Sequence, residues 1–226
     1  THGGYQPGTN LGSYWDYQGI RQVNQFMETV AGLPANILSE NDRKRLTSEA
    51  HFVRAYIYFT MARRYGGVPL VTTVQSLDDD LAVPRSTEKA TWDFVLNECN
   101  LAIENLPTAT ASRDGAYRAT KWAAYGLKSR AALHAASLAK YWNNAPLTGD
   151  AVTAGLVGGM TETDANNYYL QCINASKEII DNSGRELFKP NPASVEEATK
   201  NLQAMFETPE AAEIEIIFKK AYIDGS

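Results

Sequence analysis

One long segment, residues 40–65, constrains the fold of this chain more than any other part of the sequence. Its apolar residues recur at three- and four-residue steps, the spacing that places side chains on one face of an α-helix: Leu46, Ala50, Val53, Ile57 and Met61. Ser39 can cap the start of this helix, with Asp42 at the distance of a capping box. A left-handed stop and a helix-breaking proline follow it: Gly66, Gly67 and Pro69. The pattern therefore predicts one long helix over this segment.

Further helices are expected where the same spacing lies between a capping residue and a glycine or proline. Four such helices are expected over residues 17–30, from Ser86 or Thr87 to Pro107, from Thr120 to about residue 138, and over residues 164–182, where Gly184 follows. A fifth helix is expected to begin at Ser194, which can form a capping box with Glu197. The segment after Thr120 has an alanine-rich face, which lets a partner helix approach closely. Long loops without periodicity occur at residues 3–13 and 143–163. The sequence thus predicts a mainly α fold of stacked antiparallel helix pairs with long loops and little β-structure.

The segment from Glu213 to Ile223 has a different pattern, because it is rich in β-branched residues that partly alternate with glutamates. A short strand or an extended segment is expected there. No strict repeat with a period of about 34 residues is visible, so a regular tetratricopeptide array does not follow from self-similarity.

The composition is that of a globular protein and limits the classes of partner. The chain has 226 residues and 44% hydrophobic residues, and its 21 Lys plus Arg against 26 Asp plus Glu give a formal net charge of −5. An acidic chain is a poor electrostatic partner for nucleic acid or an anionic membrane surface, so neither is expected. No run approaches the roughly 20 apolar residues of a transmembrane helix. The start lacks a methionine and a signal peptide, so we expect residues 1–226 to be a single helical segment of a longer protein.

No motif for catalysis, phosphate binding or metal binding is found in the sequence. The three histidines have no metal-ligating partner nearby in the sequence, and a structural or surface role is favoured for His2, His51 and His134. Dispersed Asp and Glu residues could pair as the carboxylates of a glycosidase, but nothing in the sequence selects such a pair. We therefore expect no enzymatic activity, no cofactor and no metal.

Aromatic residues are the feature that points to a ligand, since the chain has 12 Tyr, 4 Trp and 7 Phe. Several of them lie outside the expected helices or at their ends, including Tyr5, Tyr14 and Trp15. A sugar ring stacks its C–H face on an aromatic plane while its hydroxyls bind polar side chains, such as those of the neighbouring Asn10 and Asp16. An equally simple interpretation is that these aromatic residues cover the ends of the helix stack.

Blocks of sequence spread in order along most of the chain resemble the SusD/RagB family of Bacteroidetes outer-membrane nutrient-binding lipoproteins. These blocks are residues 17–26, 49–59 with 65–71, 84–87 with 102–107, 118–131 and 215–218. One departure is Tyr117, which stands where the family usually has a glycine before the arginine that matches Arg118. Each block alone is weak, but their order along the chain is specific to the family.

The resemblance implies a fold, a function and a set of residues. The first half of such proteins is a tetratricopeptide-like scaffold. The resemblance implies a protein without enzymatic activity that binds oligosaccharides, or in some members peptides, at the cell surface. Such proteins deliver the ligand to a SusC-like TonB-dependent transporter. A lipid anchor attaches them to the outer membrane, and the lipid-bearing cysteine of that anchor is not found in this sequence. Ligand contacts in the family come largely from loops, which together with the aromatic pattern favours Tyr5, Asn10, Tyr14 and Trp15 as glycan-binding residues. The signature residues are expected to form scaffold contacts: Arg54, Tyr56, Tyr58, Gly66, Gly67 and Pro69.

Two other functions remain open on the sequence alone. A tetratricopeptide-type adaptor would bind a protein or peptide in a concave groove, and it would need only the helix pairs. A carbohydrate-active enzyme would need two carboxylates facing each other across a cleft, roughly 5–10 Å apart.

Overall fold

The chain folds as a mainly α-helical bundle, as the sequence predicts. The computed structural model describes residues 14–76, 78–79, 81–109, 118–142, 145–207 and 214–218, and no strand occurs among these residues. Its helices are α1 (Tyr17–Gly32), α2 (Glu40–Tyr65), α3 (Glu88–Asn105), α4 (Lys121–Tyr141), α5 (Asp150–Thr153), α6 (Glu162–Asn182) and α7 (Val195–Glu207). In this described part of the chain, no helix is both long and apolar enough to span a membrane.

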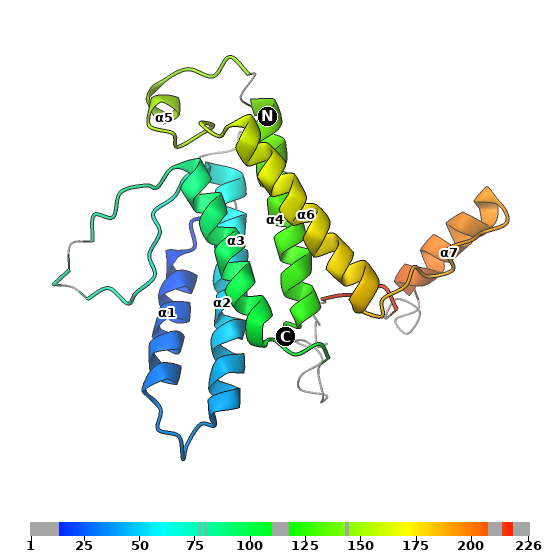
Figure 1. Cartoon of the computed structure of the whole chain (residues 1–226), viewed down its shortest axis with the longest axis horizontal. Helices are drawn as coiled ribbons and strands as arrows, with labels where there is room; N and C mark the ends of the chain where they lie inside the picture. Colours follow the sequence, from blue (N-terminus) through cyan, green and yellow to red (C-terminus); the bar gives the residue numbers. More distant parts are fainter. Residues whose placement is uncertain are drawn as a thin grey trace, which may run out of the picture.

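The long helices stack side by side in the order α1, α2, α3, α4, α6, and each runs antiparallel to the one before it (Figure 1). The most extensive contacts join α4 to α6 and α2 to α3. Helix α7 extends away from this stack beyond the end of α6 (Figure 1). Because successive helices alternate in direction, the start of α1, the end of α2, the start of α3 and the end of α4 all meet at one end of the bundle. We call this the upper end.

Local capping chemistry sets most helix boundaries where the sequence predicts them. The hydroxyl of Ser39 accepts the backbone N–H of Asp42 at 3.1 Å, and Thr87 and Thr120 cap α3 and α4 in the same way. Helix α6 begins two residues before the expected start, because Thr161 and Asp164 form a reciprocal capping box there. These bonds satisfy backbone donors that the helix itself leaves unpaired.

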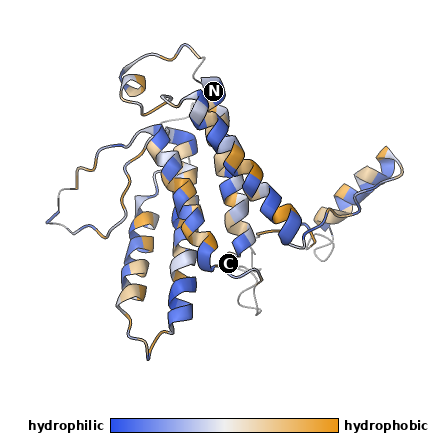
Figure 2. Ribbon diagram, viewed as in Figure 1, coloured by the Kyte–Doolittle hydropathy of each residue, from blue (hydrophilic) through white to orange (hydrophobic). Residues whose placement is uncertain are grey.

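The core lies where α2, α3, α4 and α6 face one another. Its largest fully buried side chains include Trp92, Tyr58 and Met61. The alanine-rich face of α4 is buried as expected, and it allows α6 to pack closely against it through residues such as Ala175. Figure 2 shows that apolar residues also lie along α7, where Leu202 and Phe206 are exposed.

Three further expectations about the fold differ from the structure. Val53 is 44% exposed, because α2 packs against α1, α3 and α4 on different sides and so buries Phe52, Ala55 and Phe59 rather than one narrow stripe. The loop expected over residues 143–163 contains the short helix α5. Residues 214–218 form a turn and irregular backbone rather than a strand, and no neighbouring strand occurs in the described residues to pair with them.

The glycines after α2 allow a close approach of backbone at the upper end. Gly66 has a φ of +68°, which favours glycine, and its N–H bonds to the carbonyl of Ala62. The Gly67 N–H donates to the carbonyl of Leu156 at 2.8 Å, and a side chain at Gly67 would collide with the carbonyl of Ser86. These glycines therefore join the end of α2 to the start of α3 and to the loop before α6.

Candidate functional site

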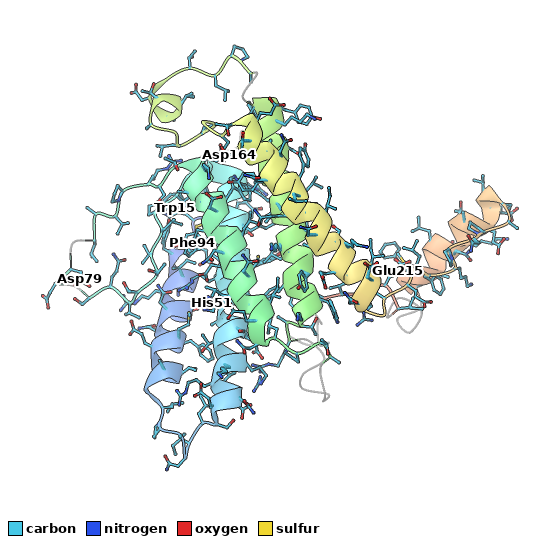
Figure 3. All side chains as sticks on the ribbon, in the orientation of Figure 1. Trp15, His51, Asp79, Phe94, Asp164 and Glu215 are labelled. Atoms are coloured by element: carbon cyan, nitrogen blue, oxygen red, sulfur yellow. The ribbon has the colours of Figure 1, made fainter. Side chains whose placement is uncertain are left out.

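A pocket lined largely by aromatic residues lies at the upper end of the bundle, where α1 begins beside the last turns of α2. It has a volume of about 340 Å³ and is lined by Tyr14, Trp15, Asp16, Tyr56, Ile57 and Thr60. Trp15 and Tyr56 are 43% and 53% exposed, so their rings are accessible to a ligand. Figure 3 shows Trp15 at the start of α1, close to the end of α2. We call this the aromatic pocket.

Contacts with the end of α2 hold the residues before α1 in place. The ring of Trp15 packs edge-on against Tyr65, with ring centres 5.0 Å apart, and also contacts Tyr17 at 5.2 Å. The backbone N–H of Tyr14 donates to the Tyr65 hydroxyl at 3.1 Å, and the guanidinium carbon of Arg64 lies 3.9 Å from the centre of the Tyr14 ring. The aromatic pocket is therefore formed by residues about 50 positions apart in the sequence.

Polar groups lie beside the exposed rings of the aromatic pocket. One oxygen of Asp16 accepts the N–H of Gly19 at 2.9 Å and so caps α1. Its second oxygen has no bond to a described residue. The Thr60 hydroxyl donates to the backbone carbonyl of Tyr56 at 3.0 Å and keeps its lone pairs available as acceptors. Exposed aromatic faces with acceptors beside them suit a ligand that has both apolar and hydroxyl-bearing sides.

A buried ionic network lies below the aromatic pocket and ties α1, α2 and α3 together. Arg54 makes two hydrogen bonds to the carboxylate of Glu98, at 2.7 and 3.0 Å, and a third to Asn24 at 2.9 Å. His51 Nδ1 lies 2.9 Å from the same carboxylate. The Asn24 amide donates to the carbonyls of Val71 and Thr73, so the network also fixes the extended segment after α2. Figure 3 shows His51 between α2 and α3.

A known protein family matches the part of the chain that forms the pocket and the buried network. The model of the SusD-like family described as "Starch-binding associating with outer membrane" matches residues 6–133, which is more than half of the chain. The chain belongs to the SusD-like family. The matched residues contain α1, α2, α3 and the first part of α4, and they therefore include both the aromatic pocket and the buried network.

Individual relatives agree with this assignment. A SusD-like protein of Bacteroides ovatus is 30% identical over 137 residues, which is 60% of this chain and 24% of that protein. The crystal structure of a SusD-like protein from Bacteroides fragilis superposes with a TM-score of 0.67 and 31% identity, covering 91% of this chain and 32% of that one. A protein crystallised with xylogluco-oligosaccharide has a TM-score of 0.56 and 25% identity over 76% of this chain and 29% of its own. This SusD-like chain thus spans about a quarter to a third of the length of these three relatives.

The structure places the sequence-predicted ligand residues as follows. Tyr14 and Trp15 lie together in the aromatic pocket, whereas Tyr5 and Asn10 lie outside the described residues. Tyr56 was expected to be a scaffold residue, but it is exposed and lines the pocket. The helical period explains this, because two positions along a helix turn a side chain by about 200°. The helical spacing of residues 54, 56 and 58 was the sequence signal that could have predicted an exposed position for Tyr56.

The other signature residues of this SusD-like chain lie at internal contacts. Arg54 belongs to the buried network, and the Tyr58 hydroxyl accepts the N–H of Val71 at 2.8 Å. The carbonyl of Pro69 accepts the hydroxyl of Tyr17 at 2.7 Å. Together with Gly66 and Gly67, these residues hold the segment after α2 against α1 and α2.

A second cavity runs along the groove between α1 and α2 and adjoins the aromatic pocket, since Asp16 and Ile57 line both. It has a volume of about 450 Å³, and its lining is mostly apolar, with Phe26 and Val53 exposed at 42% and 44%. Glu49 also lines this groove, but its carboxylate is bound by Arg45 and Arg118. In the described part of the chain, no group of three His, Cys, Asp or Glu residues is arranged to hold a metal ion.

The buried network predicts a dependence of stability on pH. Burial raises the pKa of the Glu98 carboxyl, but the hydrogen bonds from His51 and Arg54 outweigh it and hold the pKa below its ordinary value of 4.5. The ionised carboxylate therefore stabilises the folded state above about pH 4.5, and this contribution is lost as the pH falls through the lowered pKa. The difference in unfolding free energy between the native protein and Glu98→Gln should shrink below about pH 4.5. Urea unfolding at pH 3 to 7 measures it, and a constant difference would contradict this origin.

Proposed function

We propose that this chain is the scaffold part of a cell-surface protein that binds an oligosaccharide without modifying it. The aromatic pocket carries this proposal, because Trp15 and Tyr56 offer accessible ring faces and Asp16 offers a carboxylate oxygen that is unbonded to any described residue. Aromatic planes bind the C–H faces of sugars, and adjacent acceptors bind their hydroxyls. Tyr5 and Asn10 are proposed to contribute from the segment before Tyr14.

The relatives support a carbohydrate ligand. The family is described as starch-binding, and one similar structure contains a xylogluco-oligosaccharide. For the whole protein we further propose attachment to the outer membrane through a lipid anchor and delivery of the ligand to a SusC-like TonB-dependent transporter. The description of the family as associating with the outer membrane supports this location.

Replacing Trp15 by alanine should weaken oligosaccharide binding by about 10- to 100-fold, because a stacking aromatic side chain contributes on the order of 1–3 kcal/mol to a ligand contact. Isothermal titration against a panel of xyloglucan, laminarin and starch oligosaccharides would measure this. Phe206→Ala is the matched control, since Phe206 is 79% exposed on α7 and far from the pocket in the fold. The proposal would be overturned if the native protein bound none of these oligosaccharides, or if both variants lost the same amount of binding affinity.

The groove between α1 and α2 favours a second candidate function, a tetratricopeptide-type adaptor that binds a peptide. Its exposed Phe26 and Val53 could receive the apolar face of a helical peptide. Screening a peptide library against Val53→Asp and Trp15→Ala separates the two functions. Binding of peptides that depends on Val53, together with no saccharide binding, would favour the adaptor.

A carbohydrate-active enzyme would require two available carboxylates across a cleft. In the described part of the two adjoining cavities, Glu49 is held by two arginines, and Asp16 caps α1. We therefore propose binding without catalysis. Incubation with the bound oligosaccharide followed by mass analysis of the products tests this, and cleavage would refute it.

A further inference from the structure

A third cavity at the upper end of the bundle has a different chemical character from the aromatic pocket. It has a volume of about 340 Å³ and lies among the ends of α2 and α4 and the start of α3. Its lining includes Arg63, Arg64, Tyr65, His134 and Trp142. The indole of Trp142 is 46% exposed, so an aromatic face stands beside two guanidinium groups. We call this the cationic cavity.

The arginines around this cavity have no carboxylate partner in the described part of the chain, although the protein as a whole is acidic. Earlier arginines of α2 all pair with acidic side chains, namely Arg43, Arg45 and Arg54. Arg63 and Arg130 instead approach the ring of Phe59, with guanidinium carbons 5.2 and 5.9 Å from its centre. Two positive groups thus share one aromatic ring with no described negative side chain paired to either.

His134 lies close to the positive charges of Arg63 and Arg130. Burial lowers the pKa of this imidazole, and the positive charges of Arg63 and Arg130 lower it further. Among the described residues that line the cavity, Glu88 has the single carboxyl group. That group is buried and accepts the N–H of Gly158 at 2.6 Å, and burial raises its pKa above the ordinary value. The two guanidinium groups of Arg63 and Arg64 thus outnumber the one carboxyl group in the described lining, and the cavity suits an anion.

The cationic cavity shares a wall with the aromatic pocket. Arg64 lines the cavity and stacks on Tyr14, which lines the pocket. Tyr65 also lines the cavity, and its ring packs on Trp15. A ligand that spans this wall would place one unit against Trp15 and another unit against Arg63.

We infer that the cationic cavity binds the acidic group of a saccharide, a carboxylate or a sulfate, with the sugar ring against Trp142. Guanidinium groups bind planar carboxylates and sulfate oxygens through charge-assisted hydrogen bonds, and the exposed indole supplies the apolar face that a sugar needs. The assignment of a saccharide rests on the proposed function. The natural ligand is then an oligosaccharide that carries acidic groups.

The test is titration of the isotopically labelled protein with sodium glucuronate, sodium sulfate or glucose, followed by nuclear magnetic resonance at the Trp142 indole and the arginine Nε–H groups. Glucuronate should shift these signals at concentrations where glucose does not. Arg63→Gln should weaken glucuronate binding by about tenfold, because it removes a charged hydrogen-bonding group from the lining of the cavity. Lys177→Gln, which removes an exposed charge on α6, is the matched control and should leave binding unchanged.

Each alternative outcome has a distinct meaning. Shifts of the arginine signals by sulfate and glucuronate alike, with no change at the Trp142 indole, would refute the saccharide assignment and leave a simple anion site. Reduced melting temperature with unchanged glucuronate binding in Arg63→Gln would show that the arginine only stabilises the end of α2, which also overturns the inference. Loss of oligosaccharide binding in Trp15→Ala, with no response to glucuronate, would refute this inference while supporting the proposed function. No binding of any saccharide would refute both.

Discussion

Replacing Glu98 by alanine is expected to lower the unfolding free energy by about 3–5 kcal/mol, because breaking one side of a buried ion pair leaves the other charge uncompensated. Arg54 and Glu98 are both about 95% buried or more, and they bind each other through two hydrogen bonds. The loss would also free His51 and weaken the link from Asn24 to the segment after α2. Urea unfolding near pH 7 measures the change.

Two further variants test this explanation. Asp181→Ala breaks an exposed ion pair with Lys177 on α6 and should cost less than about 1 kcal/mol. The double variant Arg54→Met with Glu98→Leu should be less destabilised than Glu98→Ala alone, since apolar replacement of both partners removes the unpaired charge. Equal effects of Glu98→Ala and Asp181→Ala would show that burial of the network contributes little.

The second large effect is expected from Trp92→Ala, which should destabilise the protein by about 3–5 kcal/mol. The Trp92 side chain is fully buried on α3 and packs near Phe59 of α2 and His134 of α4, with ring centres 6.1 and 5.2 Å away. Its removal would leave a cavity where three helices meet. Thermal and urea unfolding measure the loss.

Rescue by a small aromatic molecule distinguishes a cavity from a general disruption. An apolar cavity made by truncation can bind benzene-sized ligands, so indole should raise the melting temperature of Trp92→Ala and leave the native protein unchanged. Trp92→Phe should lose less stability than the alanine variant, because it removes less volume. No response to indole would indicate that the helices collapse around the missing side chain.

The helix boundaries were predictable because the chemistry that sets them is local. Ser39, Thr87 and Thr120 each cap the residue three positions ahead, and Gly66 ends α2 through its own backbone conformation. The family was also predictable, because its sequence blocks occur in order along the chain, and the family model confirms it. The start of α6 was misplaced because the capping box of Thr161 precedes the apolar pattern.

Burial within each helix was less predictable. The periodic pattern of α2 placed Val53 inside, but this long helix touches three others and turns different faces inward along its length. Tyr56 was assigned to the scaffold together with Arg54 and Tyr58, although the helical period points it the other way. The segment near residue 215 has strand-like composition, and a strand also requires a neighbour to pair with.

The sequence by itself determined the long helices, most of their ends and the family, and it led to the proposal of Tyr14 and Trp15 as ligand residues. Tertiary structure alone decided that Tyr56 joins these two residues in a pocket, that Arg54 pairs with Glu98 from 44 positions away, and that Arg63 and Arg64 have no carboxylate partner among the described residues. The physical reason is the range of the interactions. Caps and turns act over a few residues of one chain segment, whereas pockets and buried charge pairs depend on how separate helices rotate and pack against one another.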